Sequence, residues 1–84
     1  MEKVFKKDID MDKDLVMAEV EEYIVTNVKD GYEYDVVLHE TSPVEKYEFA
    51  INNNNKKGQT VGSATVVIYE EDEQRVYEIN LIDE

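Results

Sequence analysis

The spacing of apolar residues changes once along the chain, from a helical period to a strand period. Between residues 13 and 29, apolar side chains recur every three or four positions with acidic residues among them, as in an amphipathic helix. Asp10, Asp12 and Asp14 suit the start of a helix, because an aspartate caps free backbone N–H groups and complements the helix dipole. Gly31 suits its end. The pattern predicts one helix over residues 13–29.

After Gly31, apolar and polar residues alternate, which is the period of a strand with one buried face. Four such runs cover residues 34–38, 47–51, 60–70 and 75–82, and a weaker one precedes the helix at residues 3–9. Asparagine and glycine between residues 52 and 58 predict a turn or loop. Because short connections favour antiparallel hairpins, we expect an α+β fold, with one main amphipathic helix packed on a four- or five-stranded antiparallel sheet.

The length and charge of the chain limit what it binds. Its 84 residues are enough for a single domain over residues 1–84, and 21 acidic against 9 basic residues give a net charge of −12. An excess this large lowers the stability of the compact state and should repel DNA, RNA and acidic membrane surfaces. It attracts basic surfaces, and the commonest of these belong to proteins that hold nucleic acid. The charge therefore favours a protein that takes the place of nucleic acid.

Residues that carry enzyme chemistry are sparse. Cysteine is absent, which excludes disulfides, thiolate metal sites and cysteine nucleophiles. His39 is the single histidine, and it lies in a predicted strand without an identifiable nucleophile or base beside it. No glycine-rich phosphate loop follows a strand, and residues 1–15 contain no apolar stretch typical of a signal peptide. We expect a cytoplasmic binding protein that is no enzyme and has no cofactor.

The aspartates before the helix also admit a metal site. Asp8, Asp10, Asp12 and Asp14 alternate with other residues, and Glu19 follows Asp8 by eleven positions, which is most of the spacing of an EF-hand loop. Lysine stands where the sharp turn of that loop requires glycine, and seven residues before the first aspartate are too few for an entering helix. A calcium-binding module is therefore a less favoured alternative to acids that cap a helix and face water.

A third interpretation of the same acids is a row of carboxylates. If residues 8–12 are extended, Asp8, Asp10 and Asp12 project from one edge about 6.6 Å apart, which is twice the rise of a strand. That separation is on the scale of neighbouring phosphates along a nucleic acid. Glu19 and Glu22 on the helix would continue the row, which then suits a phosphate-binding cleft.

Five short motifs follow one another in an informative order. They are EVEEYI at 19–24, DVVLH at 35–39, FAI at 49–51, VVI at 66–68 and NLI at 80–82. With the small size and the acidic charge, they resemble the phage-encoded uracil-DNA glycosylase inhibitor family over about residues 17–82. The fold of that family is an antiparallel sheet with helices packed beside it. The resemblance therefore implies the same fold class as the hydrophobic pattern.

The resemblance also implies a mechanism. Such an inhibitor mimics DNA: an acidic strand edge enters the enzyme's cleft, and an apolar pocket takes the leucine that the enzyme inserts into the duplex. It implies a 1:1 complex with uracil-DNA glycosylase, in the cytoplasm of the host cell. The implied acidic contacts are Asp8, Asp10, Glu19 and Glu22. The implied pocket residues are Met11, Val20, Tyr23, Ile24, Leu38, Phe49, Ile51 and Val67.

Two alternatives to this mechanism stay open. A DNA mimic aimed at another enzyme, such as a restriction or CRISPR nuclease, shares the charge but does not require an apolar pocket. The same apolar residues also suit the core between the helix and the sheet, whatever the partner is.

Overall fold

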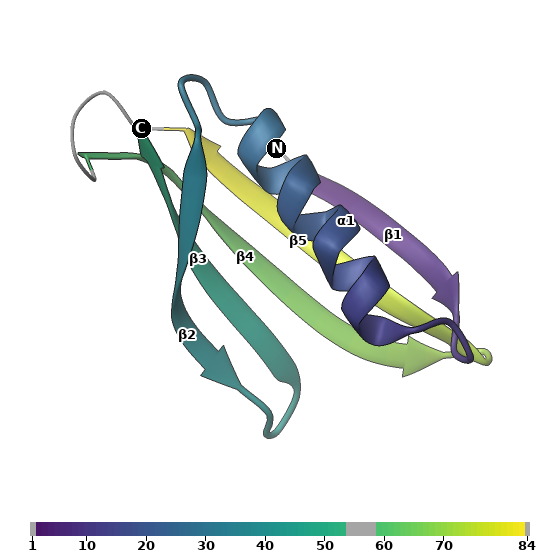
Figure 1. Cartoon of the computed structure of the whole chain (residues 1–84). Helices are drawn as coiled ribbons and strands as arrows, with labels where there is room; N and C mark the ends of the chain where they lie inside the picture. Colours follow the sequence, from purple (N-terminus) through teal and green to yellow (C-terminus); the bar gives the residue numbers. More distant parts are fainter. Residues whose placement is uncertain (1, 54–58, 84) are drawn as a thin grey trace.

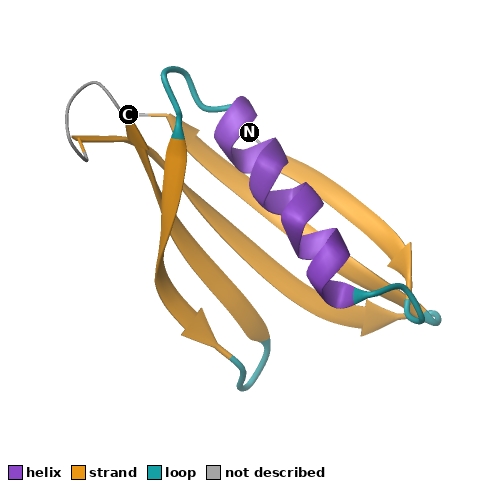
Figure 2. Ribbon diagram, in the orientation of Figure 1, coloured by secondary structure: helices purple, strands orange, loops and turns teal. Residues whose placement is uncertain are grey.

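One helix and five strands make up the protein, and a computed structural model describes residues 2–53 and 59–83. The elements are β1 (Glu2–Asp8), α1 (Lys13–Thr26), β2 (Glu33–Glu40), β3 (Glu45–Asn53), β4 (Gln59–Glu71) and β5 (Gln74–Asp83). The strands form one antiparallel sheet in the order β1-β5-β4-β3-β2, and α1 lies along one face of it (Figure 1, Figure 2). The predicted α+β fold is confirmed. Of the predicted loop at 52–58, Asn52 and Asn53 belong to β3, and the remainder lies outside the described residues.

The helix begins where the aspartates predict it. The Asp12 carboxylate accepts hydrogen bonds from the backbone N–H groups of Asp14 at 2.8 Å and Leu15 at 3.4 Å. These two N–H groups belong to the first turn and have no carbonyl partner within the helix. Asp12 is therefore the residue that fixes the start of α1.

The helix ends earlier than predicted, at Thr26 instead of near Lys29. The Asn27 side chain and its backbone N–H both donate hydrogen bonds to the Tyr23 carbonyl, at 2.8 and 3.1 Å, so this exposed carbonyl has partners without a further turn. Gly31 lies in the return to the sheet, where a Cβ would be 2.7 Å from the Val25 carbonyl oxygen. The glycine permits a close approach of the chain to the helix, and it does not cap the helix.

The hydrophobic core lies between α1 and the side chains that point to the same face of β3, β4 and β5. Its largest fully buried members are Val16, Val20, Ile24, Phe49, Ile51, Val66, Tyr77 and Ile79. Past the end of α1, Val28 closes this layer against Gly62, where a Cβ would meet Val28 Cγ1 at 2.6 Å and the Ile82 carbonyl oxygen at 2.8 Å. Among the described residues, no helix covers the opposite face of the sheet (Figure 1).

A β-bulge in β2 changes which side chains face the helix. Val36 pairs with Phe49, but the register shifts at the next residue, so that Leu38 pairs with Glu48. Because side chains alternate between the two faces of a strand, one extra residue moves all later positions to the other face. The bulge places Leu38 on the helix-free face.

Replacing Tyr77 by phenylalanine should raise the free energy of unfolding by about 1 kcal/mol. The Tyr77 hydroxyl is buried and has no hydrogen-bond partner among the described residues. Removing it therefore removes a desolvation cost while the ring stays in the core. Urea unfolding measures the change, with Tyr69→Phe as the control, because the Tyr69 hydroxyl donates to Glu78 at 2.8 Å on the surface. A lower stability of Tyr77→Phe would show that this hydroxyl has a stabilising partner.

Candidate functional site

Most of the residues assigned to a leucine pocket form the core. Val20, Ile24, Phe49 and Ile51 are 0–1% exposed, and they contact one another and their core neighbours between the helix and the sheet. Tyr23 packs beside them with its ring edge-on to Phe5, at 5.7 Å between centroids. These five residues are brought together as predicted, but the four buried ones are closed to a partner in this structure, and Tyr23 is only partly exposed.

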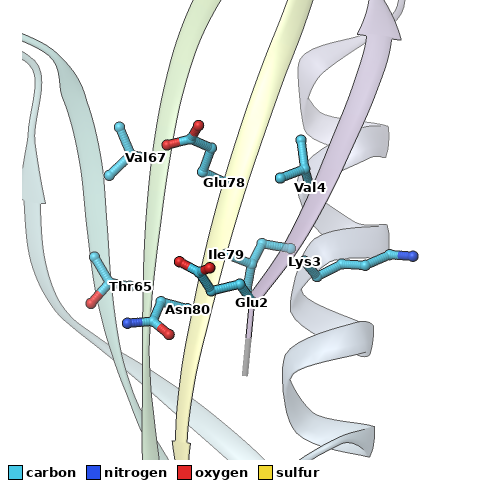
Figure 3. Close-up of a pocket in the computed structure, with 8 residues that line it drawn as sticks. All are labelled: Glu2, Lys3, Val4, Thr65, Val67, Glu78, Ile79 and Asn80. Atoms are coloured by element: carbon cyan, nitrogen blue, oxygen red, sulfur yellow. The ribbon is translucent and has the colours of Figure 1, made fainter.

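The other three residues assigned to that pocket lie elsewhere. Val67 alternates with the core residue Val66 and therefore points to the helix-free face, which Leu38 also shares because of the bulge. A cavity of about 400 Å³ lies over β1, β4 and β5 on that face, and Val67 is one of its lining residues (Figure 3). Met11 is 48% exposed in the turn before α1. The assignment of these three residues to one pocket with the core residues is therefore wrong.

The predicted row of carboxylates is also wrong. Strand β1 ends at Asp8, and a tight turn follows in which the Asp10 backbone N–H donates to the Asp8 carboxylate at 2.9 Å. The Asp12 carboxylate caps the helix. A short polar side chain that bonds to backbone N–H groups two residues on stabilises a turn at the expense of an extended strand. Residues 8–12 therefore present no extended acidic edge.

The surroundings of the predicted acidic contacts are partly basic. Strand β1 is one edge of the sheet and carries Lys3, Lys6 and Lys7. Glu19 forms an ion pair with Lys7 at 3.5 Å, and Glu22 is an exposed residue of α1. A basic strand beside Glu19 reduces the attraction of this edge for a basic partner.

The aspartates do not gather as a metal site. Within residues 2–53 and 59–83, no three aspartate, glutamate or histidine side chains lie close enough together to hold a metal ion. The carboxylates of Asp8 and Asp12 accept backbone hydrogen bonds instead. The geometry gives the calcium-binding alternative no support.

The acidic edge of the sheet is β2, at the opposite side from β1. Its acidic residues are Glu33, Asp35 and Glu40, and the strand contains neither lysine nor arginine. Val36 and Val37 are half-exposed or more between these acids. The alternation of apolar and polar residues predicts a buried face for this strand, because alternation does not show whether a strand lies at the centre or the edge of a sheet.

A groove of about 420 Å³ separates the beginning of β2 from the C-terminal half of α1. Its lining residues are Ala18, Glu21, Glu22, Val25, Thr26, Tyr32, Glu33 and Tyr34. The Tyr34 ring packs edge-on to Phe49, with 5.5 Å between centroids. Burial, and after it a hydrogen bond to the Glu21 carboxylate, raises the pKa of Tyr34. The groove is therefore aromatic and acidic. In the sequence, the two tyrosines on either side of Glu33 are a sign of this groove that the hydrophobic pattern does not reveal.

A polar cluster holds β2, β3 and α1 together near the other end of the helix. The Glu45 carboxylate accepts from Lys13 Nζ and lies 3.1 Å from His39 Nε2. The His39 ring stacks on Tyr47, with 4.0 Å between centroids. These contacts indicate a structural role for His39, which connects β2 to β3.

Acid should weaken the fold through Glu45. Partial burial by itself raises the pKa of this carboxyl, but the hydrogen bonds from Lys13 and His39 outweigh it and lower the pKa below its ordinary value of 4.5. A carboxyl whose pKa is lower in the folded than in the unfolded state stabilises the fold at pH values above its ordinary pKa. This contribution is lost as the pH falls through the lowered pKa. We therefore expect the free energy of unfolding, measured with urea at pH 7 and at pH 3, to fall more for the natural chain than for Glu45→Gln. The matched control is the exposed neighbour, Glu40→Gln, and an equal loss in natural chain and Glu45→Gln would contradict the assignment.

No protein-family model, curated protein or solved structure matches this chain. Over the part of the chain that the structure describes, no helix is long and apolar enough to cross a membrane.

Proposed function

We propose that this protein inhibits uracil-DNA glycosylase by mimicking DNA, in a 1:1 complex that requires no cofactor. The observation that carries the proposal is the uneven distribution of charge. Residues 14–45, which form most of α1, all of β2 and the turn into β3, contain nine acidic residues and one lysine. An acidic surface of this kind is complementary to the basic cleft of a DNA-binding enzyme and accelerates its encounter with that cleft.

The choice of uracil-DNA glycosylase as the partner rests on the resemblance of five motifs to its inhibitor family. In this chain the motif EVEEYI lies on α1, and the other four motifs lie on β2, β3, β4 and β5. A helix beside an antiparallel sheet is also the architecture that the resemblance implies. In this proposal the acidic contacts come from α1 and β2, and the basic edge β1 stays outside the cleft.

A second candidate is an acidic DNA mimic that inhibits another enzyme on nucleic acid, such as a nuclease. The observation in its favour is the closed core. Val20, Ile24, Phe49 and Ile51 are fully buried, so that no pocket for an inserted leucine is open at these residues. A nuclease inhibitor requires the acidic surface and no such pocket.

Uracil excision from a labelled oligonucleotide tests the proposal. A bacterial uracil-DNA glycosylase should lose its activity as this protein approaches one molar equivalent, and the loss should persist at moderate salt. Undiminished excision at large excess would contradict the proposal. Parallel titration of a restriction nuclease and a CRISPR nuclease then decides whether the second candidate explains the charge.

A further inference from the structure

The groove between α1 and β2 combines two kinds of chemistry that recognise cations. Strand β2 and the residue before it supply the phenol rings of Tyr34 and Tyr32, and α1 supplies Glu21 and Glu22. None of the eight lining residues is basic. Aromatic faces and carboxylates attract a positive charge independently of each other, through the ring quadrupole and through Coulomb attraction.

Within the part of the chain that the structure describes, no ion pair neutralises the carboxylates of the groove. The described residues form ion pairs elsewhere, for example between Lys7 and Glu19 and between Lys13 and Glu45, and none of these pairs includes Glu21, Glu22 or Glu33. Glu21 and the Tyr34 phenol both line the groove, and a neutral phenol leaves the negative charge of that carboxylate in place. The groove can therefore bind a cation from outside the chain.

We infer that the groove binds an arginine side chain of the basic partner. This inference takes the partner's basic character from the proposed function, and it adds the point of contact. A guanidinium is planar, stacks on tyrosine rings and donates two parallel hydrogen bonds to one carboxylate. The groove offers both surfaces on facing elements, the rings from the β2 side and the carboxylates from the helix.

The chemistry of the groove disfavours other side chains. A leucine would cover Glu21 and Glu33 without replacing the hydrogen bonds that these carboxylates make with water. A lysine ammonium satisfies the charge, but it is more strongly hydrated and does not stack on a ring. Arginine uses all the groups that line the groove.

A titration of the ¹⁵N-labelled protein with a penta-arginine peptide tests the inference without any glycosylase. We expect amide shifts in residues 18–26 and 32–34, and weaker binding at higher salt. The variant Glu21→Gln should bind about tenfold more weakly, as expected when a hydrogen bond to a charged group is lost. The variant Glu71→Gln removes the same charge at the far end of β4 and should bind like the natural chain.

A second variant separates the rings from the charge. Tyr32 is 61% exposed, so Tyr32→Ala should keep the dispersed spectrum of a folded protein while it weakens binding of penta-arginine. Penta-lysine should bind the natural chain more weakly than penta-arginine, and Tyr32→Ala should reduce this preference.

Three results would overturn the inference. They are shifts spread over β1 and β5 instead of the groove, an equal effect of Glu21→Gln and Glu71→Gln, and binding of penta-lysine at least as tight as that of penta-arginine. The result of this peptide titration does not depend on whether the proposed function is correct. Groove-localised binding of penta-arginine without inhibition of the glycosylase would support the groove and refute the partner. Inhibition that Glu21→Gln leaves unchanged would refute the groove and keep the partner.

Discussion

Replacing Phe49 by alanine should lower the free energy of unfolding by about 3–5 kcal/mol, as large-to-small changes at buried aromatic positions do. Phe49 is 1% exposed, and its ring contacts Tyr34 and Tyr47, with centroids at 5.5 and 5.8 Å. Domains of this size have only about 5–15 kcal/mol of stability in total, so a large part of the variant should unfold at low denaturant. Urea unfolding followed by circular dichroism measures the loss.

The same experiment distinguishes a core from a pocket at Phe49. Leu15→Ala is the control, since Leu15 is 71% exposed on the outer side of α1 and should change stability by less than about 0.5 kcal/mol. If Phe49→Ala were as mild as Leu15→Ala, Phe49 would line a solvent-filled pocket. That result would restore the interpretation of these residues as the site for an inserted leucine.

Reversing two charges on β2 should slow association with the glycosylase by about tenfold or more at low salt. In the variant Glu33→Lys/Glu40→Lys, two lysines replace exposed acids on the edge that we place against the basic cleft. The difference from the natural chain should shrink at 1 M salt, where the Debye length falls to about 3 Å. Surface plasmon resonance on immobilised glycosylase gives the association rate.

The control for this variant carries the same change in net charge at another place. Glu2→Lys/Glu71→Lys alters the exposed start of β1 and the exposed end of β4. It should slow association much less, because these acids lie away from the α1 and β2 surface. Equal slowing by both double variants would show that total charge governs the encounter and that β2 is no specific contact.

The elements of the fold are predictable from the sequence, because each depends on a local pattern. Helical spacing over residues 13–29 and alternation in the later runs identify α1 and four strands, and the Asp12 cap fixes the start of the helix. Its end was predicted three residues late, because the side chain of Asn27 bonds to a terminal carbonyl before Gly31 is reached. Single side-chain hydrogen bonds of this kind are not visible in a hydrophobic pattern.

The faces of the strands were harder to predict than the strands themselves. Val36 and Leu38 are two residues apart, and only the register shift between them shows that they point to opposite faces. Residues 66–68 are three consecutive apolar β-branched residues, so the alternation does not reveal that Val66 faces the helix and Val67 does not. Assignment of a pocket from sequence therefore failed where the outcome depends on pairing with another strand.

The groove was unpredictable for a related reason. Glu21 and Tyr34 are thirteen positions apart, and both line the groove because the chain after α1 returns beside the helix. The charge alone indicated a basic partner. The order of strands in the sheet is what places the acidic strand β2 and the lysine-bearing strand β1 at opposite edges.

Competition with DNA tests the central claim of mimicry most directly. A fluorescent duplex with an abasic site, bound to uracil-DNA glycosylase, has a high anisotropy because the complex tumbles slowly. We predict that this protein lowers the anisotropy to the value of free DNA at about one molar equivalent. Anisotropy that stays high, or rises because a ternary complex forms, would contradict the claim that the protein occupies the place of DNA.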